Sequence, residues 1–481
     1  MSIRAASKEL KKLLGKESVL DRPEDLMVYE YDASLAKGTP DLVVLPQSTE
    51  HVVAIVKTAN KYKIPIVPRG AGTGLSGGSV PRQGGIVVTF SRMGRILEVD
   101  VPNRRAVVQP GVVNTELSAR VAKNGLYFAP DPSSQRASTI GGNVAENSGG
   151  PHTLAQGVTV NHITGLEVVL PSGEVVEFGG KAADSVGFDL TGFFTGSEGL
   201  IGIVTKITVR LTRVAESVAT LLAIYNTVDD AANTVTAITS AGITPAALEM
   251  LDGVTLRAVE DATHAGFPRD SGAVLLIELE GLREAVEEQA ESVKAVCERH
   301  QARDVRRAKD DAERALLWKG RKTAFASLGR ITPAYYSQDV VVPRTKIPEI
   351  LRFIEGISKK YNQRIGNIFH AGDGNLHPAI MFDLRDPAQV ERTHQAGFDI
   401  CAQCIKMGGT ITGEHGVGME KQALMSLLFT EDDLDVMKRL HDAFNPEGTM
   451  NPQKVFPMTR GCREGVVSTV RPPEVVAEVA G

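Results

Sequence analysis

The segment of residues 68–78 constrains the fold more than any other part of the chain, because it places five glycines within nine residues. It follows directly on the β-branched run 64–67, which predicts a strand. Glycines let a backbone approach a charged group closely and point successive N–H groups at it. No Gly-Lys-[Ser/Thr] ends the segment and no helical pattern follows it, so Walker A and Rossmann loops are excluded. We therefore expect the segment to bind a diphosphate; an elaborate surface turn is the alternative.

Two further glycine-rich clusters lie downstream, in residues 130–151 and 195–203. Both fall in a region of short β-branched runs that predicts several strands. One tight loop can hold a phosphate, whereas three loops in one β-rich region suit a long cofactor that lies across several strand ends. The three clusters together therefore predict a dinucleotide site.

Composition and charge narrow the class of protein. The 481 residues are 42% hydrophobic, and 47 are glycine, which is high for a soluble globular chain. The formal net charge of −5 and the lack of a long basic block argue against nucleic-acid binding. No run of about 18 apolar residues occurs, so we expect no membrane span. Four scattered cysteines indicate a reducing compartment, and we expect a soluble, cytoplasmic protein.

The pattern of short elements divides the chain into unequal parts. Between residues 42 and 211, brief strands alternate with loops around one helix at 51–61 and one hairpin at 166–178. From about residue 217, strands and longer helices alternate, which predicts an α+β domain with one solvated helical layer. We expect domains at 1–213 and 214–420, a helical segment at 421–457 and a tail at 458–481.

The segment from residue 366 to 382 predicts a hairpin with its loop at 372–375. This loop would place His370 directly opposite His377. Directly opposed side chains have Cβ atoms about 4.5–5.5 Å apart on one face of a sheet, which lets two imidazoles bind one ion.

A catalytic metal site needs a third ligand, and the glycine-flanked pair Glu414-His415 offers two candidates. Spacing alone leaves open which of them binds the metal; zinc, manganese and iron all accept such ligands. The imidazole that stays free would act as a general base, because its pKa near 6.5 suits proton transfer at neutral pH. Solvent-edge histidines without a metal are the alternative.

Two further segments carry side chains with possible chemistry. The stretch 318–322 contains the single tryptophan, Trp318, and three cations, of which Arg321 could bind a carboxylate with its planar fork. A solvated helix face explains this stretch equally well. Cys401 and Cys404 form a CxxC within an apolar helical pattern, which favours a buried structural pair over a redox motif.

These segments together resemble the FAD-linked oxidases of the vanillyl-alcohol oxidase type, in the branch that holds the glycolate oxidase flavoprotein and the D-lactate (D-2-hydroxyacid) dehydrogenases. The matching pieces run from about residue 40 to residue 457: PRGAGTGLSGG, the loops of 130–151, TGSEGLIGIV, WKGR, HAGDGNLHP, GEHGVGMEK and NPEGTMNPQKVFP. The resemblance implies an α+β fold, with a two-subdomain FAD-binding domain of the PCMH type and a ferredoxin-like cap. The segment 421–457 would return to the FAD domain.

The resemblance also implies roles for individual residues. His370, His377 and Glu414 would bind the divalent metal, His415 would be the base, and Arg321 would bind the substrate carboxylate. FAD would be non-covalent, because Gly72 and Thr73 stand where relatives with covalent flavin carry a histidine. The implied FAD contacts are Pro68, Arg69, Gly70, Ala71, Gly72, Thr73, Gly74, Leu75, Ser76, Pro132, Ser133, Thr139, Gly141, Gly142, Asn143, Asn147, Gly149, Gly150, Val204, Glu414, Asn451 and Lys454.

The activity implied by the resemblance is oxidation of a small 2-hydroxy acid to the 2-oxo acid, with hydride passing to flavin N5. Hydroxyglutarate enzymes have a threonine where Phe325 stands and a lysine near Ser337, and the absence of both favours glycolate or D-lactate. Electrons would leave to a partner subunit, a quinone, a cytochrome or an electron-transfer flavoprotein. The chain would form a homodimer or join an oxidase complex, in the cytoplasm or peripherally at the inner membrane. The alternatives are an FAD-dependent transferase of the alkyl-dihydroxyacetonephosphate synthase kind and a non-catalytic flavoprotein within an oxidase complex.

Overall fold

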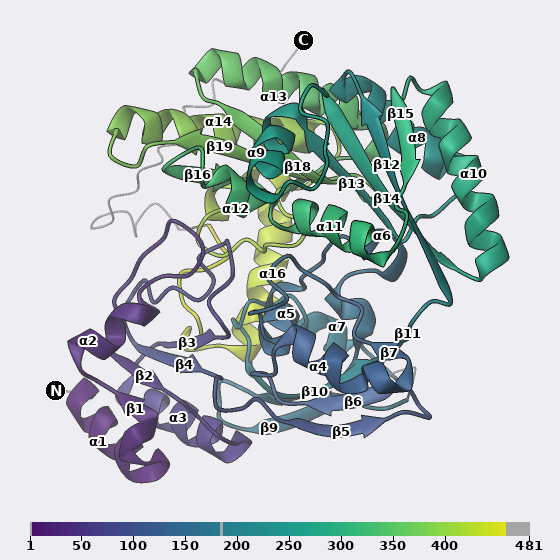
Figure 1. The fold of residues 1–481 in the computed structure, drawn as a ribbon. Helices are drawn as coiled ribbons and strands as arrows, with labels where there is room; N and C mark the ends of the chain where they lie inside the picture. Colours follow the sequence, from purple (N-terminus) through teal and green to yellow (C-terminus); the bar gives the residue numbers. More distant parts are fainter. Residues whose placement is uncertain (1, 183–185, 458–481) are drawn as a thin grey trace.

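The computed structural model describes residues 2–182 and 186–457, which form two bodies (Figure 1). The first half of the chain builds the lower body in Figure 1, and most of the second half builds the upper body. Helix α16 (Glu431–Phe444) runs between them, and the chain then returns to the lower body. There Met450 pairs with Ile66, and the N–H of Asn451 donates to the carbonyl of Ile66.

The first sheet of the lower body contains the strands on either side of the helix predicted at 51–61. Its strand order is β1-β2-β4-β3, with β2, β4 and β3 parallel. The two middle strands and the edge strand β3 are apolar, as strands covered by helices should be. The elements of this part are β1 (Val19–Leu20), β2 (Leu42–Val44), β3 (Ile66–Arg69), β4 (Ile86–Thr89), α1 (Ser2–Leu14), α2 (Pro23–Leu26) and α3 (Thr49–Tyr62).

The second sheet of the lower body is antiparallel, with the order β5-β6-β10-β8-β9. It contains the predicted hairpin as β8–β9, and its inner face packs on the short helices α4, α5 and α7. Its elements are β5 (Ile96–Asp100), β6 (Arg105–Val108), β8 (Ile163–Val169), β9 (Val175–Gly179), β10 (Ile203–Arg210), α4 (Asn114–Val121), α5 (Ile140–Glu146), α6 (Thr153–Gln156) and α7 (Leu190–Phe194). A separate pair is formed by β7 (Leu126–Tyr127) and β11 (Thr212–Arg213).

The upper body is one eight-stranded sheet, whose main path is β15-β12-β14-β13-β18-β19-β16, with β17 paired to β19. Alternate residues of β12 and β14 enter two different apolar clusters, one on each face. The strands are β12 (Ser217–Tyr225), β13 (Ala247–Asp252), β14 (Ala273–Gly281), β15 (Asp304–Arg307), β16 (Ala334–Ser337), β17 (Val340–Val341), β18 (Ile365–His370) and β19 (Asn375–Phe382).

Helices cover both faces of this sheet, so the prediction of one helical layer is wrong. One face carries α8 (Val228–Ser240), α10 (Arg283–Arg299), α13 (Ile347–Tyr361) and α14 (Pro387–Lys406), and α15 (Met425–Leu428) joins that cluster. The other face carries α9 (Gly253–Thr263), α11 (Asp311–Lys322) and α12 (Ala324–Leu328). Cys401 and Cys404 are fully buried on α14, as predicted. Among the described residues, no helix is both long and apolar enough to cross a membrane.

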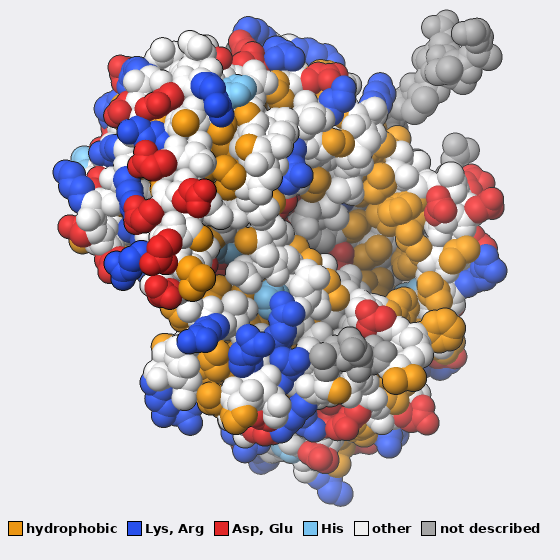
Figure 2. Space-filling model, turned by 90° about the vertical axis from the view of Figure 1, so that its right-hand side faces the viewer, with side chains coloured by type: hydrophobic (Ala, Val, Ile, Leu, Met, Phe, Trp, Pro, Cys, Tyr) orange, Lys and Arg blue, Asp and Glu red, His pale blue; other side chains and the backbone are white. Residues whose placement is uncertain are grey.

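A buried ion-pair junction joins the two bodies. His152 of the lower body lies 3.0 Å from Asp131 and 3.5 Å from Glu278 of β14, and its ring stacks on Trp318 of α11. Glu278 also accepts hydrogen bonds from Trp318 and Arg314. Although burial acts to lower it, the carboxylates of Asp131 and Glu278 raise the pKa of His152 to about 10. Figure 2 shows the surface hollowed where the bodies meet, with hydrophobic side chains gathered at the hollow.

Candidate functional site

A cavity between the two bodies brings together most of the chemistry-bearing segments. Its lower wall is the glycine-rich loop after β3 and the segment that leads into α5. Its upper wall comes from α11, from β18 and β19 of the eight-stranded sheet and from the loop after α14, with Arg321, His370, His377, Glu414 and His415. Segments that are far apart in the sequence therefore line one space.

Two glycines of the first loop, Gly70 and Gly72, stand where another residue would be strained. A Cβ on Gly70 would lie 2.7 Å from the hydroxyl oxygen of Thr139, and Gly72 has a φ of +71°. Behind the loop, the side chains of Asn451 and Lys454 donate hydrogen bonds to the carbonyl of Gly78 at 3.0 and 3.1 Å. The loop is thus held in place from the side that faces away from the cavity.

The sequence-predicted FAD contacts divide into two groups. Those that line the cavity are Pro68, Gly70, Ala71, Gly72, Thr73, Gly74, Leu75, Pro132, Ser133, Thr139, Gly142, Asn143 and Glu414. Those outside its lining are Arg69, Ser76, Gly141, Asn147, Gly149, Gly150, Val204, Asn451 and Lys454. Of the second group, Asn147 lines a neighbouring cavity, and Arg69 bonds to Ser79.

Several buried polar atoms of the cavity wall have no protein partner. These are Oγ of Ser138, Nδ2 of Asn143 and Oε2 of Glu146. Burial, followed by the neighbouring carboxylates of Glu198 and Asp32, raises the pKa of Glu146 well above its ordinary value. Unpartnered buried polar groups are costly unless a ligand satisfies them. A glycine cradle with orphaned donors therefore fits an extended, polar, phosphate-bearing cofactor.

The hairpin that carries His370 and His377 has a different register from the predicted one. His370 pairs with Asn375, and His377 pairs with Ile368, so the predicted direct opposition of the two histidines is wrong. The true register is shifted by two residues. Since side chains alternate with a period of two, both histidines still lie on one face. Their ring centroids are 5.1 Å apart.

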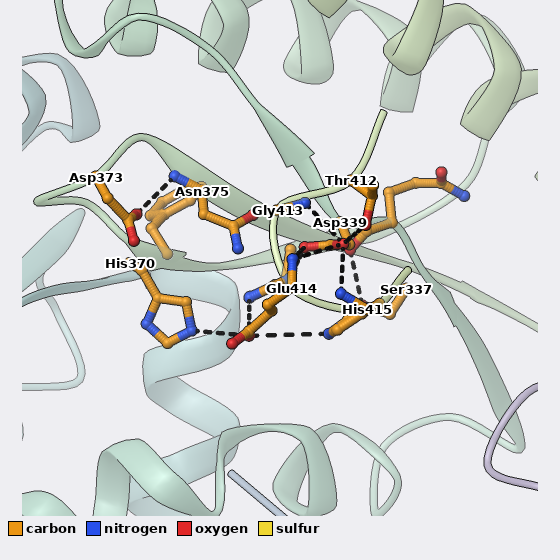
Figure 3. Close-up of polar contacts among 12 residues, drawn as sticks. Ser337, Asp339, His370, Asp373, Asn375, Thr412, Gly413, Glu414 and His415 are labelled. Atoms are coloured by element: carbon orange, nitrogen blue, oxygen red, sulfur yellow. Dashed lines mark hydrogen bonds and ion pairs between the residues drawn. The ribbon is translucent and has the colours of Figure 1, made fainter. Parts of the chain in front are cut away.

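Glu414 lies between the two histidines. Its Oε1 is 3.2 Å from Nε2 of His370 and 3.2 Å from Nε2 of His377, while its Oε2 has no partner. Figure 3 shows Glu414 placed between His370 and His415. Burial acts to raise the pKa of Glu414, but His370 and His377 outweigh it and hold this pKa well below its ordinary value. Two imidazoles and a carboxylate converging at this spacing fit a divalent ion.

His415 lies beside this group, and its side chain is 13% exposed. Its ring stacks on His377 with centroids 4.9 Å apart, and its Nε2 is 3.9 Å from Glu414. The backbone N–H groups of Gly413, Glu414 and His415 donate to the carboxylate of Asp339 at 3.0, 3.2 and 2.9 Å. Burial lowers the pKa of His415 to about 4. The imidazole is therefore uncharged at neutral pH, and its pKa lies below the value near 6.5 that was expected for the base from the sequence.

Arg321 reaches the cavity from α11 and is almost fully buried. Its Nη2 forms an ion pair with Glu249 and donates to the carbonyl of Phe369 at 3.2 Å, while its Nε has no partner. Glu249 also lies 2.9 Å from Nδ1 of His370. This carboxylate thus holds both the guanidinium and the imidazole, in the arrangement that orients metal-ligating histidines.

Two of these carboxylates, Glu249 and Asp339, lie outside the motifs that the sequence singles out. Glu249 lies between apolar residues within β13, whose last residue is the buried Asp252, and Asp339 comes directly before β17. A carboxylate inside an apolar strand is the signal that could have found Glu249, because such groups are almost never buried without a partner.

Comparisons with known proteins agree with this arrangement. Residues 40–179 match the family described as FAD binding domain, and residues 214–455 match FAD linked oxidases, C-terminal domain. The chain is similar to "Glycolate oxidase subunit GlcD" of Escherichia coli (strain K12), with 44% identity over 93% of this chain and 90% of that protein. It is 42% identical to the protein of the same name in Bacillus subtilis, over 97% of this chain and 100% of that one.

More distant relatives and solved structures extend the comparison. "Probable D-lactate dehydrogenase, mitochondrial" of Danio rerio is 32% identical over 88% of this chain and 85% of that protein. The crystal structure of p-cresol methylhydroxylase with substrate bound has a TM-score of 0.81 at 17% identity, over 95% of this chain and 97% of that one. An alkyldihydroxyacetonephosphate synthase structure has a TM-score of 0.74 at 20% identity, over 94% and 86%. The two structures show the shared fold alone.

Proposed function

Because this chain belongs to the FAD-linked oxidase family, we propose that it oxidises glycolate or D-lactate to the 2-oxo acid. Relatives named glycolate oxidase subunit and D-lactate dehydrogenase support this substrate class. The observation that carries the proposal is the arrangement of side chains in one cavity. Three ligand-type side chains, a neutral imidazole and an arginine converge in the cavity that the glycine-rich loop lines.

His370, His377 and Glu414 would hold the divalent ion, and the loop after β3 would hold FAD. When bound, FAD supplies the hydride acceptor, and the ion polarises the α-hydroxyl group and lowers its pKa. Glu249 keeps the His370 ring oriented by its contact with Nδ1, which leaves Nε2 directed at Glu414.

Arg321 would bind the substrate carboxylate through the part of its guanidinium that no protein group engages. A charged, planar donor fixes a carboxylate in one orientation, so that Cα is presented to the acceptor. Phe325 lines the same cavity and contacts His377 with its ring. An apolar side chain at this place favours a substrate without a second carboxylate.

His415 would take the proton of the α-hydroxyl group. Its lowered pKa keeps it unprotonated before the reaction, and Asp339 fixes the backbone of its loop. General bases of this kind contribute about 10²–10⁴-fold to a rate. The electrons would pass to an acceptor other than NAD, and the relatives named as subunits support a place in an oxidase complex.

The test is oxo acid formation with a dye acceptor and four acids: glycolate, D-lactate, L-lactate and D-2-hydroxyglutarate. We expect glycolate or D-lactate to react best. Arg321→Lys should raise the KM for that acid, because lysine offers no planar fork. The exposed Arg330→Lys is the matched control and should leave KM unchanged. Failure of all four acids would refute the proposal and favour a transferase or a non-catalytic flavoprotein.

A further inference from the structure

We propose that Glu146, which lies outside the predicted FAD contacts, faces the bound flavin as an uncharged acid and donates a hydrogen bond to its ring. The inference rests on the FAD of the proposed function and is independent of which acid is the substrate. Glu146 is the last residue of α5 and lines the same cavity as Arg321 and the candidate metal ligands. Its carboxyl group therefore belongs to the wall against which the cofactor would lie.

Helix α5 places Glu146 at the end of the cavity where the acid would react. The helix lies on the side of the lower body that faces the upper body (Figure 1). It begins after Thr139, whose hydroxyl oxygen would be 2.7 Å from a Cβ on Gly70, and it is seven residues long. With a rise of about 1.5 Å per residue, its last residue lies about 9 Å further along the wall. A cofactor that starts at the glycine-rich loop and presents its ring to the substrate therefore passes Glu146 with the ring end.

Three glycines leave room for the carboxyl group of Glu146. A Cβ on Gly78 would lie 2.8 Å from its Oε1, and a Cβ on Gly74 would lie 3.9 Å from the same atom. A Cβ on Gly416, whose φ is +81°, would collide with its Oε2. The carboxyl group thus lies between the end of the glycine-rich loop and the loop that carries the candidate ligand Glu414.

The carboxyl group of Glu146 has an unused hydrogen-bonding atom. Its Oε2 has no partner among the residues that the structure describes. The side chain is partly exposed, and it lines this cavity and the neighbouring one. A polar group is costly to hold in a protein wall without a partner, which indicates that a ligand completes this group.

A second carboxyl group, that of Glu198, lies close to Glu146. Its Oε1 would be 2.9 Å from the same Cβ on Gly416. Glu198 accepts hydrogen bonds from the N–H groups of Val417 and Gly418, both at 2.7 Å, and such donors stabilise a charged carboxylate. When two neighbouring carboxyl groups share a site, the one without donors keeps the proton. The geometry therefore assigns the proton to Glu146.

The surrounding charges agree with this assignment. Burial raises the pKa of both Glu146 and Glu198. For Glu146, the carboxylates of Glu198 and Asp32 raise the pKa further, and it stays well above its ordinary value although Lys454 and Lys421 act to lower it. Glu146 is thus uncharged at neutral pH and has an O–H group to donate.

A donor at this place would set how readily the flavin accepts electrons. Hydrogen bonds to the flavin ring are among the means by which a protein tunes this cofactor. The reduced ring carries more negative charge than the oxidised ring, and hydrogen bonds to charged acceptors are the stronger ones. The O–H group of Glu146 therefore stabilises the reduced form and raises the reduction potential, whereas an ionised carboxylate would lower it.

The test measures the flavin reduction potential of the FAD-loaded protein by dithionite titration against a reference dye. Glu146→Met removes the donor and should lower the potential by about 30 mV, which is about tenfold in the equilibrium constant of a two-electron reduction. Glu146→Gln keeps an uncharged donor and should keep the parental potential. Glu116→Met, at an exposed position of α4 in the same body, is the matched control and should also keep it.

Infrared spectroscopy gives the second measurement. The difference spectrum between the FAD-loaded parent chain and Glu146→Gln should contain the carbonyl band of one protonated carboxyl group. If Glu146→Met loses its FAD, this band and the potential of Glu146→Gln decide the question. An unchanged potential in FAD-loaded Glu146→Met, a raised potential in Glu146→Gln, or absence of the band would each overturn the inference. Because dithionite replaces the acid, a failure here is distinct from a failure of the proposed oxidation.

Discussion

Replacing Glu249 by glutamine should show how much this supporting carboxylate contributes to stability and metal affinity, because it changes no proposed metal ligand and no proposed substrate contact. Glu249 is 1% exposed and Arg321 is 2% exposed, and the carboxylate also contacts Nδ1 of His370 at 2.9 and 3.0 Å. Glutamine fills the same volume and keeps one acceptor oxygen. The substitution therefore removes a charge from a buried pair without opening a cavity.

The expected cost follows from leaving Arg321 without its counter-ion. Breaking a buried ion pair by removing one partner costs about 3–5 kcal/mol, and we expect the lower end because glutamine still accepts a hydrogen bond. Loss of a group that orients a metal-ligating histidine typically lowers metal affinity by about 10–100-fold. Both effects should appear although no ligand and no substrate contact has changed.

The assay uses the single tryptophan of the chain. Trp318 lies on α11, in the same body as Glu249, so its fluorescence reports urea unfolding of that body. The unfolding is measured with excess chelator, and metal affinity is measured separately by zinc titration. Glu287→Gln breaks an exposed pair with Arg307 and is the control, which should behave like the parent chain. Parental stability and zinc affinity in Glu249→Gln would refute the reasoning.

Three further predictions concern the loop, the base and the junction between the bodies. Gly70→Ala should lower the ratio of bound FAD to protein, because its Cβ would lie 2.7 Å from Thr139 Oγ1; Gly356→Ala, with nothing within 4 Å, should not, and equal FAD content in both would contradict the cradle. His415→Asn should slow flavin reduction by the acid about 10²–10⁴-fold at unchanged metal content, and an unchanged rate in stopped flow would remove it as the base. The pKa of His152, about 10 in the folded protein against 6.5, means that its contribution to stability is complete below pH 6.5 and is lost as pH rises toward 10. Urea midpoints should fall over this window in the parent chain more than in His152→Gln, and parallel profiles would contradict this.

Local structure was predictable where neighbouring residues decide it. The helix expected at 51–61 is α3, which begins after Ser48, whose hydroxyl accepts from the N–H of His51, and ends at the left-handed Lys63. The strands around it follow β-branched runs next to glycine or proline. The strand order was not predictable, because β4 lies between β2 and β3 through contacts that no local pattern encodes.

In the hairpin of the two histidines, a turn predicted one residue too late gave the wrong pairing of the two strands. The turn occupies residues 371–374, where the carbonyl of His370 accepts from the N–H groups of Asp373 and Gly374. Gly374 has a φ of +83° and closes the turn one residue earlier than the sequence suggests. A shift of one residue at the turn moves the register by two, so the shared face survived although the opposing pairs changed.

The candidate metal ligands of the site were predictable from the sequence, whereas the carboxylates that orient them were not. The histidines and Glu414 stand in glycine-flanked motifs, which a linear search can find. Glu249 lies in β13 and Asp339 lies beside β17. Both strands pair with strands that are distant in sequence, so only the folded chain brings these carboxylates to the site. A buried carboxylate acquires its role from neighbours that only the folded chain supplies.

The central claim is that this chain passes hydride from a small 2-hydroxy acid to its own flavin. The most direct measurement is an anaerobic titration of the FAD- and metal-loaded protein with glycolate and D-lactate while the flavin absorbance is recorded. The account predicts bleaching of the flavin with one equivalent of the preferred acid and formation of one equivalent of the 2-oxo acid. A fully loaded flavin that neither acid bleaches would contradict it.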